Sequence, residues 1–414
     1  MEDRSVHTLP PDREHRPRQP QQAPGGNRRL MIPHGLNIFG PTTMATGIAE
    51  SLRGFIQAVR HSGTPCTVHG ISRHRPATAS PAQLPGNLYP VNCLYFNPGS
   101  FHKEFLPSHG LATLQDRYNI GFWYWETDRL RRSWRACLPY YQEIWTGSEF
   151  CRKIFQNQSS LPVVVIPPVV VPDQEAVDPL PLTIPSGRFV VLCCYDYRSS
   201  FQRKNPAAVV RAFQRAFPRQ DDVLLVLKAR TAGLPRPLAR QHASMTRFAR
   251  GWWPFTSGDK RILLLEDDLT RNQINALLRR SDCLISLHRS EGFGMHLAEA
   301  LSLGTPVVAT GYSGNMDFMR EENSYLVRYK LVRVRRGNRP YPAGSHWAEP
   351  DVDHAVELLQ HVYRHREEAR QKAQCGAQFL RQYHSLQHVG QLLKAQLDRV
   401  FAQASACAKS PIST

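Results

Sequence analysis

From Leu36 onward, short apolar runs alternate with helical patterns, and this alternation limits the fold more than any other feature of the sequence. It is typical of consecutive βαβ units, which place parallel strands side by side and cover the sheet with helices. The sequence therefore predicts an α/β fold. The expected strands are Leu36–Phe39, Cys93–Phe96, Ile120–Tyr124, Ile144–Thr146, Val163–Ile166, Phe189–Cys194, Val223–Leu227, Ile262–Leu265, Cys283–Leu287, Pro306–Ala309 and Tyr325–Val327.

The alternation stops in the proline-rich stretch Pro167–Pro185, which is interpreted as a linker between domains, and then starts again. Since 414 residues exceed what one hydrophobic core usually serves, we expect two α/β domains, at residues 29–182 and 183–365. Within the second domain, Asn205 and Pro206 are expected to cap and begin one helix, and the capping box Thr270-x-x-Gln273 is expected to begin another. Helical patterns at 366–405 close the chain. Residues 1–28 are rich in Pro, Gln and Arg and nearly free of large apolar side chains, which predicts a disordered tail.

Composition narrows the cellular setting. No apolar run reaches the roughly 18 residues of a membrane helix, and the N-terminus lacks the apolar segment of a secretory signal. The nine cysteines are odd in number and have no Cys-x-x-Cys spacing. Together these features favour free thiols and a cytoplasmic location.

The formal net charge of +18 fits three kinds of partner: nucleic acid, an anionic membrane surface or polyanionic small substrates. The charge is mostly arginine and is spread along the chain. Zinc-finger, RNP-like and helix-turn-helix signatures are missing, so nucleic acid is not expected as a partner. A bias of the host genome toward arginine is a further explanation that the sequence leaves open.

The clearest functional pattern lies at residues 286–310, where a buried strand, a glycine-rich turn and a helix follow one another. Ligands bind outside the carboxyl ends of such strands. Gly292 and Gly294 allow close approach of the backbone to a ligand, and the helix N-terminus favours a phosphate there. Glu291 and Glu299, with seven residues between them, are suited to hold hydroxyl groups on either side of a pyrophosphate. The alternative is a plain strand–turn–helix crossover with an incidental acid at each end.

A basic element follows the first strand of the second half and contains Arg198, Arg203 and Lys204. Fixed cations stabilise the negative charge that develops on a departing pyrophosphate. Lys228, at the end of the next strand, is a second candidate for a phosphate contact. The alternative for the element is an exposed basic turn.

The string Glu291-Gly-Phe-Gly through Glu299-Ala resembles the Glu-x7-Glu signature of glycosyltransferase family 4. Arg198 and Lys204 have the six-residue spacing of the Arg and Lys that bind the donor diphosphate in that family. The resemblance, to a bacterial branch, implies the glycosyltransferase B fold: two Rossmann-like domains with a final helix, near residues 386–401, that crosses back to the first domain.

The same resemblance implies a retaining transferase that moves a sugar from a nucleotide-diphosphate sugar to a glycan or lipid-linked acceptor, in bacterial polysaccharide or glycoconjugate assembly. The domain at 29–182 would face the acceptor, and the domain at 183–365 would bind the donor. No metal ion or other cofactor is expected. Asp267-Asp268 and Asp351-x-Asp353 are interpreted as helix starts rather than metal ligands.

Residue roles follow from the resemblance. Glu299 would bind the ribose hydroxyls of the donor, and Glu291 the hydroxyls of the transferred sugar near its third carbon. Relatives often have a hydrophobic residue where Arg198 stands, so Arg203 can take the diphosphate role instead. Phe293 belongs to the donor-binding turn with its flanking glycines.

Three further matches are looser. Gly314 and Asn315 would present backbone amides to the sugar or diphosphate, unless their turn serves only the fold. Gly47 lies where the family has a glycine-rich loop between the domains. Glu126 lies where many relatives carry a histidine near the sugar, and it is a candidate catalytic residue.

Between Asp128 and Tyr141, apolar side chains including Leu130 and Trp134 recur at helical spacing among four arginines. This pattern predicts a basic amphipathic helix that lies in the headgroup region of an anionic membrane, at the inner face of the cell membrane. The alternative is a helix that packs its apolar stripe on its own sheet.

Three other functions stay open on the sequence alone. They are a sugar-nucleotide epimerase or hydrolase on the same fold, a non-catalytic sugar-nucleotide binder, and, suggested only by charge, a nucleic-acid-binding protein.

Overall fold

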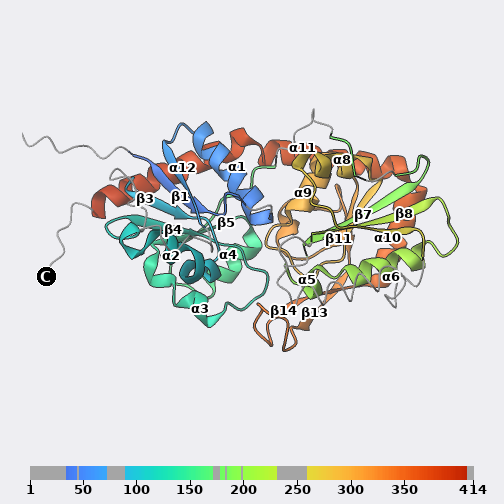
Figure 1. Ribbon diagram of the computed structural model, residues 1–414, viewed down its shortest axis with the longest axis horizontal. Helices are drawn as coiled ribbons and strands as arrows, with labels where there is room; N and C mark the ends of the chain where they lie inside the picture. The colour runs from blue at the N-terminus through green and yellow to red at the C-terminus, as the bar shows by residue number, and fades with distance from the viewer. Residues whose placement is uncertain are drawn as a thin grey trace, which may run out of the picture. The chain divides into compact units, whose positions relative to one another are not determined.

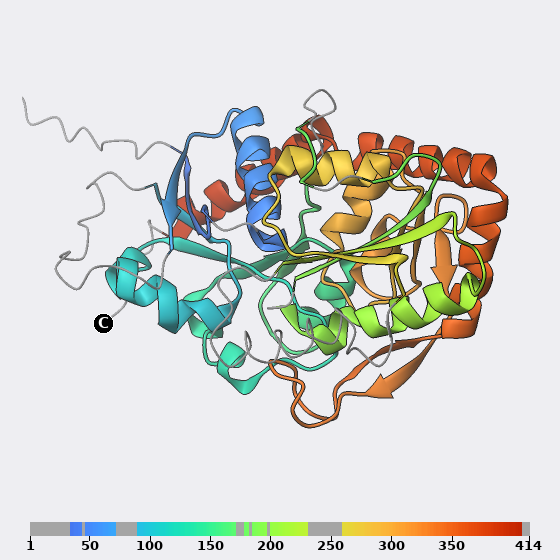
Figure 2. The same cartoon turned by 45° about the vertical axis from the view of Figure 1, so that its right-hand side comes forward.

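The computed structural model describes residues 34–43, 46–71, 89–170, 178–181, 184–196, 199–230 and 259–407. The predicted disordered tail and part of the predicted linker lie outside these residues, so those predictions are untested. The described chain contains two six-stranded parallel sheets and a separate two-stranded hairpin (Figures 1 and 2). The predicted α/β fold is confirmed.

The first sheet has the strand order β2-β1-β3-β4-β5-β6 and lies within the predicted range 29–182. Its β2 was not predicted, because its residues are only half-buried and its apolar run is short. The strands are β1 Leu36–Gly40, β2 Cys66–Gly70, β3 Val91–Leu94, β4 Tyr118–Phe122, β5 Glu143–Thr146 and β6 Val163–Val165.

The helices of this half are α1 Gly47–His61, α2 Leu106–His109, α3 Arg132–Arg135 and α4 Glu149–Gln156. Short helical turns at Pro98–Ser100, Phe101–Phe105, Leu111–Thr113 and Leu138–Tyr140 connect them.

The second sheet has the order β12-β11-β10-β7-β8-β9 and lies within the predicted range 183–365. Its strands are β7 Phe189–Asp196, β8 Val223–Arg230, β9 Ile262–Leu265, β10 Cys283–Ser286, β11 Val307–Thr310 and β12 Tyr325–Val327. Its helices are α5 Phe201–Lys204, α6 Pro206–Ala216, α8 Arg271–Arg280, α9 Met295–Ser302, α10 Val352–Arg364 and α11 Arg366–Tyr383.

Strand β7 shows how the second sheet is covered on both faces. Phe189 and Val191 belong to the apolar core that includes α6 and α10, whereas Val190 and Leu192 belong to the core shared with α8, α9 and α11. Alternate residues of a strand point to opposite faces, so a strand buried on both faces needs a continuous apolar run. This is why the strand was predictable from sequence.

Helix punctuation was also largely predictable. The expected capping box at Thr270 forms, with Thr270 Oγ1 accepting from the Gln273 amide. Asn205 and Pro206 do open α6, but Asn205 makes no side-chain cap there; it has φ +53° and donates through Nδ2 to Leu287 O. The predicted cap was therefore right in position and wrong in its hydrogen bond.

The final helix, expected near residues 386–401, is α12 Leu386–Cys407, and it packs against α1 of the first half (Figure 1). The predicted crossing back is confirmed. Strands β13 Tyr329–Arg333 and β14 His346–Pro350 form an antiparallel hairpin that the sequence analysis missed.

The predicted amphipathic membrane helix at 128–141 is wrong as stated. Helix α3 is four residues long, and Leu130 and Trp134 are buried, with the Trp134 ring packed on Trp123 and Trp125. The apolar stripe thus covers the molecule's own sheet.

No helix among the described residues is long and apolar enough to cross a membrane. The eight cysteines whose side chains the structure describes are unpaired thiols, as expected.

Candidate active site

Five side chains form a continuous path of ion pairs and hydrogen bonds at the carboxyl edge of the second sheet. Lys204 Nζ lies 2.6 Å from Glu291 Oε1, and Arg203 Nη1 lies 3.1 Å from Glu291 Oε2. Arg203 Nη2 is 3.9 Å from Glu126 Oε1, and the hydroxyl of Tyr341 donates to Glu126 Oε2 at 3.2 Å. Four of the five residues were predicted site residues, and the path links the loop after β4 to the second sheet.

The short helix α5 positions the two cations. Ser200 opens it with φ +67° and accepts the Arg203 amide on its hydroxyl, and Asn205 closes it with φ +53°. Non-glycine residues in the left-handed region are uncommon and cluster at functional sites. The Arg203 carbonyl also accepts the amide of Arg289 at 2.7 Å, so α5 is fastened to the loop after β10.

Glu291 is fixed by its own backbone as well as by its side chain. Its amide donates to Ser313 Oγ at 2.7 Å, and its carbonyl accepts the Gly314 amide at 3.0 Å. Burial alone would raise the pKa of the Glu291 carboxyl, but Arg203 and Lys204 hold that pKa well below its usual value. The carboxylate is therefore ionised and held ready to accept hydrogen bonds from hydroxyl groups.

Close backbone packing explains the glycines of the turn. A Cβ on Gly314 would lie 2.2 Å from the Gly292 carbonyl oxygen, so residue 314 must be small. That same carbonyl accepts from Ser148 Oγ at 2.6 Å, which ties α4 to the turn. Gly294 has φ +96° and begins α9. The Gly314 amide already donates to the Glu291 carbonyl oxygen. The prediction that this amide binds the sugar or diphosphate of the donor substrate is therefore not supported.

Glu299 lies on α9, and its partner was not predicted. Arg271 Nη1 of α8 donates to Glu299 Oε1 at 2.8 Å, and Arg271 Nε lies 3.9 Å from Glu50 on α1. Burial raises the pKa of the Glu299 carboxyl, against the lowering effect of Arg271. No sequence motif marks Arg271, although a buried carboxylate calls for a cation nearby.

The other predicted residues have mixed placements. Phe293 packs on the rings of Phe318 and His384, which gives it a core role. Asn315 is fully buried; its Oδ1 lies 3.1 Å from His288 Nε2, and its Nδ2 donates to Thr310 O.

Lys228 is buried at the end of β8, where its Nζ donates to Ala229 O. Gly47 is the first residue of α1 and has open space where a Cβ would be. Arg198 lies outside the described residues, so the cations that the structure places on Glu291 are Arg203 and Lys204.

One further histidine belongs to this neighbourhood. His296 is the second residue of α9, and its Nε2 is buried with no hydrogen-bond partner among the described residues. Burial and the charge of Lys204 lower the pKa of His296 to about 3, so the ring is neutral. It precedes Glu299 by three residues, which places both on one face of the helix. That spacing was the available sequence signal, and it was missed.

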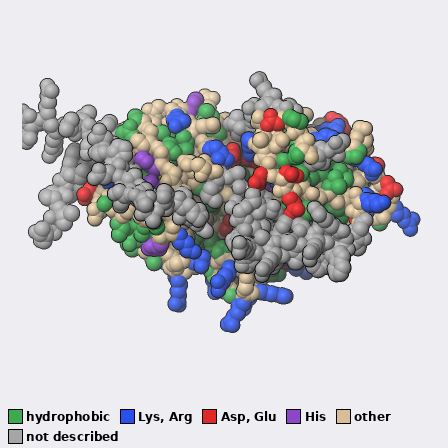
Figure 3. All heavy atoms as spheres, viewed as in Figure 1, with side chains coloured by type: hydrophobic (Ala, Val, Ile, Leu, Met, Phe, Trp, Pro, Cys, Tyr) green, Lys and Arg blue, Asp and Glu red, His purple; other side chains and the backbone are tan. Residues whose placement is uncertain are grey.

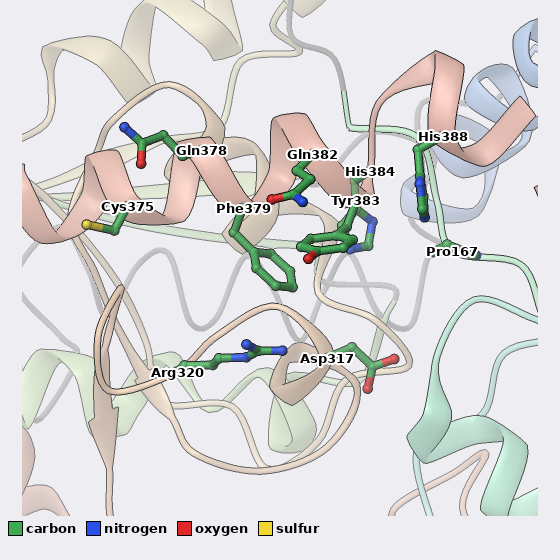
Figure 4. A pocket seen from close by; sticks show the side chains of 10 residues that line it. All are labelled: Pro167, Asp317, Arg320, Cys375, Gln378, Phe379, Gln382, Tyr383, His384 and His388. Carbon is green, nitrogen blue, oxygen red and sulfur yellow. The ribbon is translucent and has the colours of Figure 1, made fainter. Parts of the chain in front are cut away.

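A separate cavity of about 670 Å³ lies where α11 meets α12 (Figure 4). In Figure 4 the guanidinium of Arg320 lies below the ring of Phe379, 4.7 Å from its centroid. Asp317, His384 and His388 also line the cavity. It contains none of the predicted site residues, so the site is defined by the charged path rather than by this hollow.

The family model described as "Family 4 Glycosyltransferase in conflict systems" matches residues 149–393, more than half of the chain. No curated protein matches the chain significantly.

Three solved structures illustrate the likeness. Sucrose-phosphate synthase from Thermosynechococcus elongatus is 13% identical, with a TM-score of 0.65 over 89% of this chain and 100% of that one. Anabaena HepE, solved with UDP and glucose, is 14% identical, with a TM-score of 0.59 over 88% of this chain and 100% of HepE. TarM from S. aureus is 14% identical, with a TM-score of 0.51 over 75% of this chain, which spans about half (54%) of TarM.

At such identities the solved structures establish the fold: two Rossmann-like domains of the glycosyltransferase B type. The family model covers α4 through the first third of α12, and so includes α5, Glu291 and Glu299. The chain belongs to the family 4 glycosyltransferases in conflict systems.

Proposed function

We propose that the protein transfers a sugar, with retention of anomeric configuration, from a nucleotide-diphosphate sugar to a glycan or lipid-linked acceptor. The observation that carries the proposal is the pairing of Glu291 with Arg203 and Lys204 beside the start of α9. Two fixed cations and a helix N-terminus favour a diphosphate, and an ionised carboxylate beside them favours sugar hydroxyls.

In the reaction, the bond between the anomeric carbon and the diphosphate oxygen breaks, and the acceptor hydroxyl oxygen bonds to the same face of the sugar. The electron pair of the broken bond leaves with the diphosphate, where Arg203 and Lys204 stabilise the added charge. Glu126, which is 18% exposed beside Arg203, takes the proton of the acceptor hydroxyl. No metal ion is required in this scheme, because the two side-chain cations act at the diphosphate.

Glu299 holds the ribose of the donor nucleotide in this proposal. Its present partner Arg271 then shares the carboxylate with the ribose hydroxyls or moves toward Glu50. HepE was solved with UDP and glucose, which makes a UDP-sugar the first donor to test. The family description places its members in conflict systems, and we take this as a setting alongside polysaccharide or glycoconjugate assembly.

The test is a panel of UDP-, GDP- and dTDP-sugars incubated with purified protein, with nucleotide release as the readout. One donor should be turned over well above the rest, and NMR of the product should show the anomeric configuration of the donor. A product of inverted configuration would contradict the proposed retention but would still support sugar transfer. Binding of a donor without nucleotide release would instead identify a non-catalytic sugar-nucleotide binder.

A further inference from the structure

Two segments far apart in the sequence carry a dense set of exposed cations. Residues 129–142 and 328–346 contain no Asp or Glu, although together they hold ten of the 52 Lys and Arg residues. All ten side chains are exposed. We call this set the arginine surface; it comprises Arg129, Arg131, Arg132, Arg135, Arg328, Lys330, Arg333, Arg335, Arg336 and Arg339.

Contacts near the active site hold the two segments together. The His346 amide donates to Asp128 Oδ1 at 2.7 Å, and His346 Nδ1 lies 2.8 Å from Asp128 Oδ2. The ring of Tyr341 packs on Trp125 with centroids 5.3 Å apart. In Figure 3, Lys and Arg side chains project from the lower edge of the molecule, where Figure 1 shows α3 and the β13–β14 hairpin. The two segments therefore lie side by side.

Little of this charge is neutralised within the described part of the chain. Among the described residues, Arg328 is the one cation of the ten that forms an ion pair, with its Nε 3.7 Å from Asp351 Oδ2. Asp128, the carboxylate between the segments, is bound to His346. Like charges held close together cost free energy, and an anionic ligand relieves that cost.

The surface also leads into the active site. Tyr341 lies in the loop between β13 and β14, and its hydroxyl donates to Glu126. A polymer lying on the arginine surface would therefore reach the proposed acceptor side of the reaction. Because nine of the ten cations are arginines, whose planar forks match phosphate oxygens, the chemistry favours phosphate groups over scattered carboxylates.

An anionic bilayer fits less well. Leu130 and Trp134 are buried, so the α3 segment offers no apolar anchor. The large apolar side chains exposed on the hairpin are Tyr329 (40%) and Leu331 (57%). A surface with many charges and few anchors suits a linear polyanion, whose binding is driven by counterion release.

We propose that the acceptor is carried on a phosphodiester-linked polymer that lies on the arginine surface and presents its accepting hydroxyl at Glu126. This identification of the acceptor rests on the proposed transfer function, whereas the binding surface itself does not. The polymer is a phosphodiester-linked glycan or polyol, because the sequence has no zinc-finger, RNP-like or helix-turn-helix signature of a nucleic-acid-binding protein. Nucleic acid carries the same phosphodiester groups, and the experiment includes it as the competing occupant.

The test compares two triple variants with the same change in charge. R333S/R335S/R336S removes three cations of the arginine surface, and R364S/R370S/R381S removes three exposed arginines of α10 and α11. Binding to four probes is measured from 50 to 300 mM salt: fluorescent inorganic polyphosphate, a single-stranded 20-nucleotide DNA, a glycerol-phosphate polymer and phosphatidylglycerol vesicles.

The surface variant should bind about tenfold or more weakly, and its plot of log affinity against log salt should be shallower by about three. The control should match wild type. Equal losses in both variants, or binding only to vesicles of phosphatidylglycerol, would overturn the proposal.

Sugar transfer to each polymer then separates the two sources. The surface variant should lose transfer to the preferred polymer while it releases nucleotide from donor into water at the wild-type rate. Sugar found on the glycerol-phosphate polymer would support the proposal, and sugar found on DNA alone would overturn it in favour of nucleic acid. Transfer to neither polymer, with intact donor turnover, would refute the acceptor. Absence of donor turnover in wild type would instead refute the proposed function and leave the binding result standing.

Discussion

The ammonium of Lys204 and the carboxylate of Glu291 lie 2.6 Å apart, although the residues are separated by 87 positions in the sequence. The topology explains the pairing: β7 and β10 are neighbours in the sheet, and each residue comes from the turn that follows its strand. In a parallel sheet those turns meet at one edge. Two distant sequence patterns therefore form one site.

We expect Glu291→Ala and Lys204→Ala each to reduce sugar transfer by orders of magnitude while the protein stays folded. One charge-stabilising donor at a transition state is worth about 3–4 kcal/mol, which corresponds to a rate loss of two to three powers of ten. Initial rates with a saturating donor and circular dichroism would measure this. Glu357→Gln, which alters an exposed carboxylate on α10, is the control. Near-normal rates in both variants would contradict the assignment.

Transfer should not depend on a divalent metal ion. In the proposed reaction, the side chains of Arg203 and Lys204, which lie together at Glu291, neutralise the diphosphate in place of an ion. Rates measured before and after treatment with EDTA should agree. Loss of activity with EDTA and its recovery with magnesium or manganese would show that the cations are insufficient.

Arg399→Ala should destabilise the protein by about 2 kcal/mol. Glu143 is fully buried and accepts from Arg399 Nη2 at 2.6 Å, so the variant leaves a buried carboxylate without its cation. Arg399 is 37% exposed, which keeps the loss below that of a fully buried pair. Urea denaturation would measure it. The control is Lys394→Ala on the same helix, whose exposed pair with Asp398 should matter by less than about 0.5 kcal/mol. Equal effects would show that the Glu143 pair has no special role.

Stability should fall in mild acid partly because of His384. This side chain is 4% exposed and donates through Nδ1 to Pro168 O, and burial lowers its pKa to about 4. The unfolded chain takes up a proton near pH 6.5, whereas the folded protein does not until about pH 4. The contribution of neutral His384 to the free energy of unfolding is therefore fully present above pH 6.5. It decreases as the pH falls, by about 2 kcal/mol at pH 5.

Urea unfolding at pH 7 and pH 5 tests the histidine. His384→Gln should be less stable than wild type at pH 7 but should lose less stability on acidification. His365→Gln, at an exposed position, should follow the wild-type pH dependence. Parallel pH dependence in wild type and His384→Gln would rule out this source of acid sensitivity.

Features encoded over short stretches of sequence were predictable. The strands of the second sheet are continuous apolar runs because both faces are buried, and the capping box at Thr270 depends only on residues three apart. The site motif was predictable for the same reason. Glu291, Gly294 and Glu299 lie on one turn and one helix, so their spacing in sequence fixes their spacing in the fold.

Features that depend on contacts across the fold were not predictable. Tyr341 reaches Glu126 across 215 residues, and Arg271 reaches Glu299 from a different helix. The sequence pattern of the apolar stripe with Trp134 is the same for a helix that faces lipid and for a segment that packs on protein. The packing of Trp134 on Trp123 and Trp125 shows that the stripe faces protein. The β13–β14 hairpin was missed because the exposed strand β13 lacks the alternating burial of a strand with one face in the core.

The return of α12 to the first half of the molecule has a consequence for biosynthesis. Val389, Leu393 and Leu397 complete the apolar core that also contains Leu52 and Phe55 of α1. The ribosome makes these residues after the strands of both sheets, so the half of the protein that is made first cannot finish folding until α12 has been synthesised. Until then its incomplete core is exposed to chaperones and proteases, while the second half already has the strands of its own sheet.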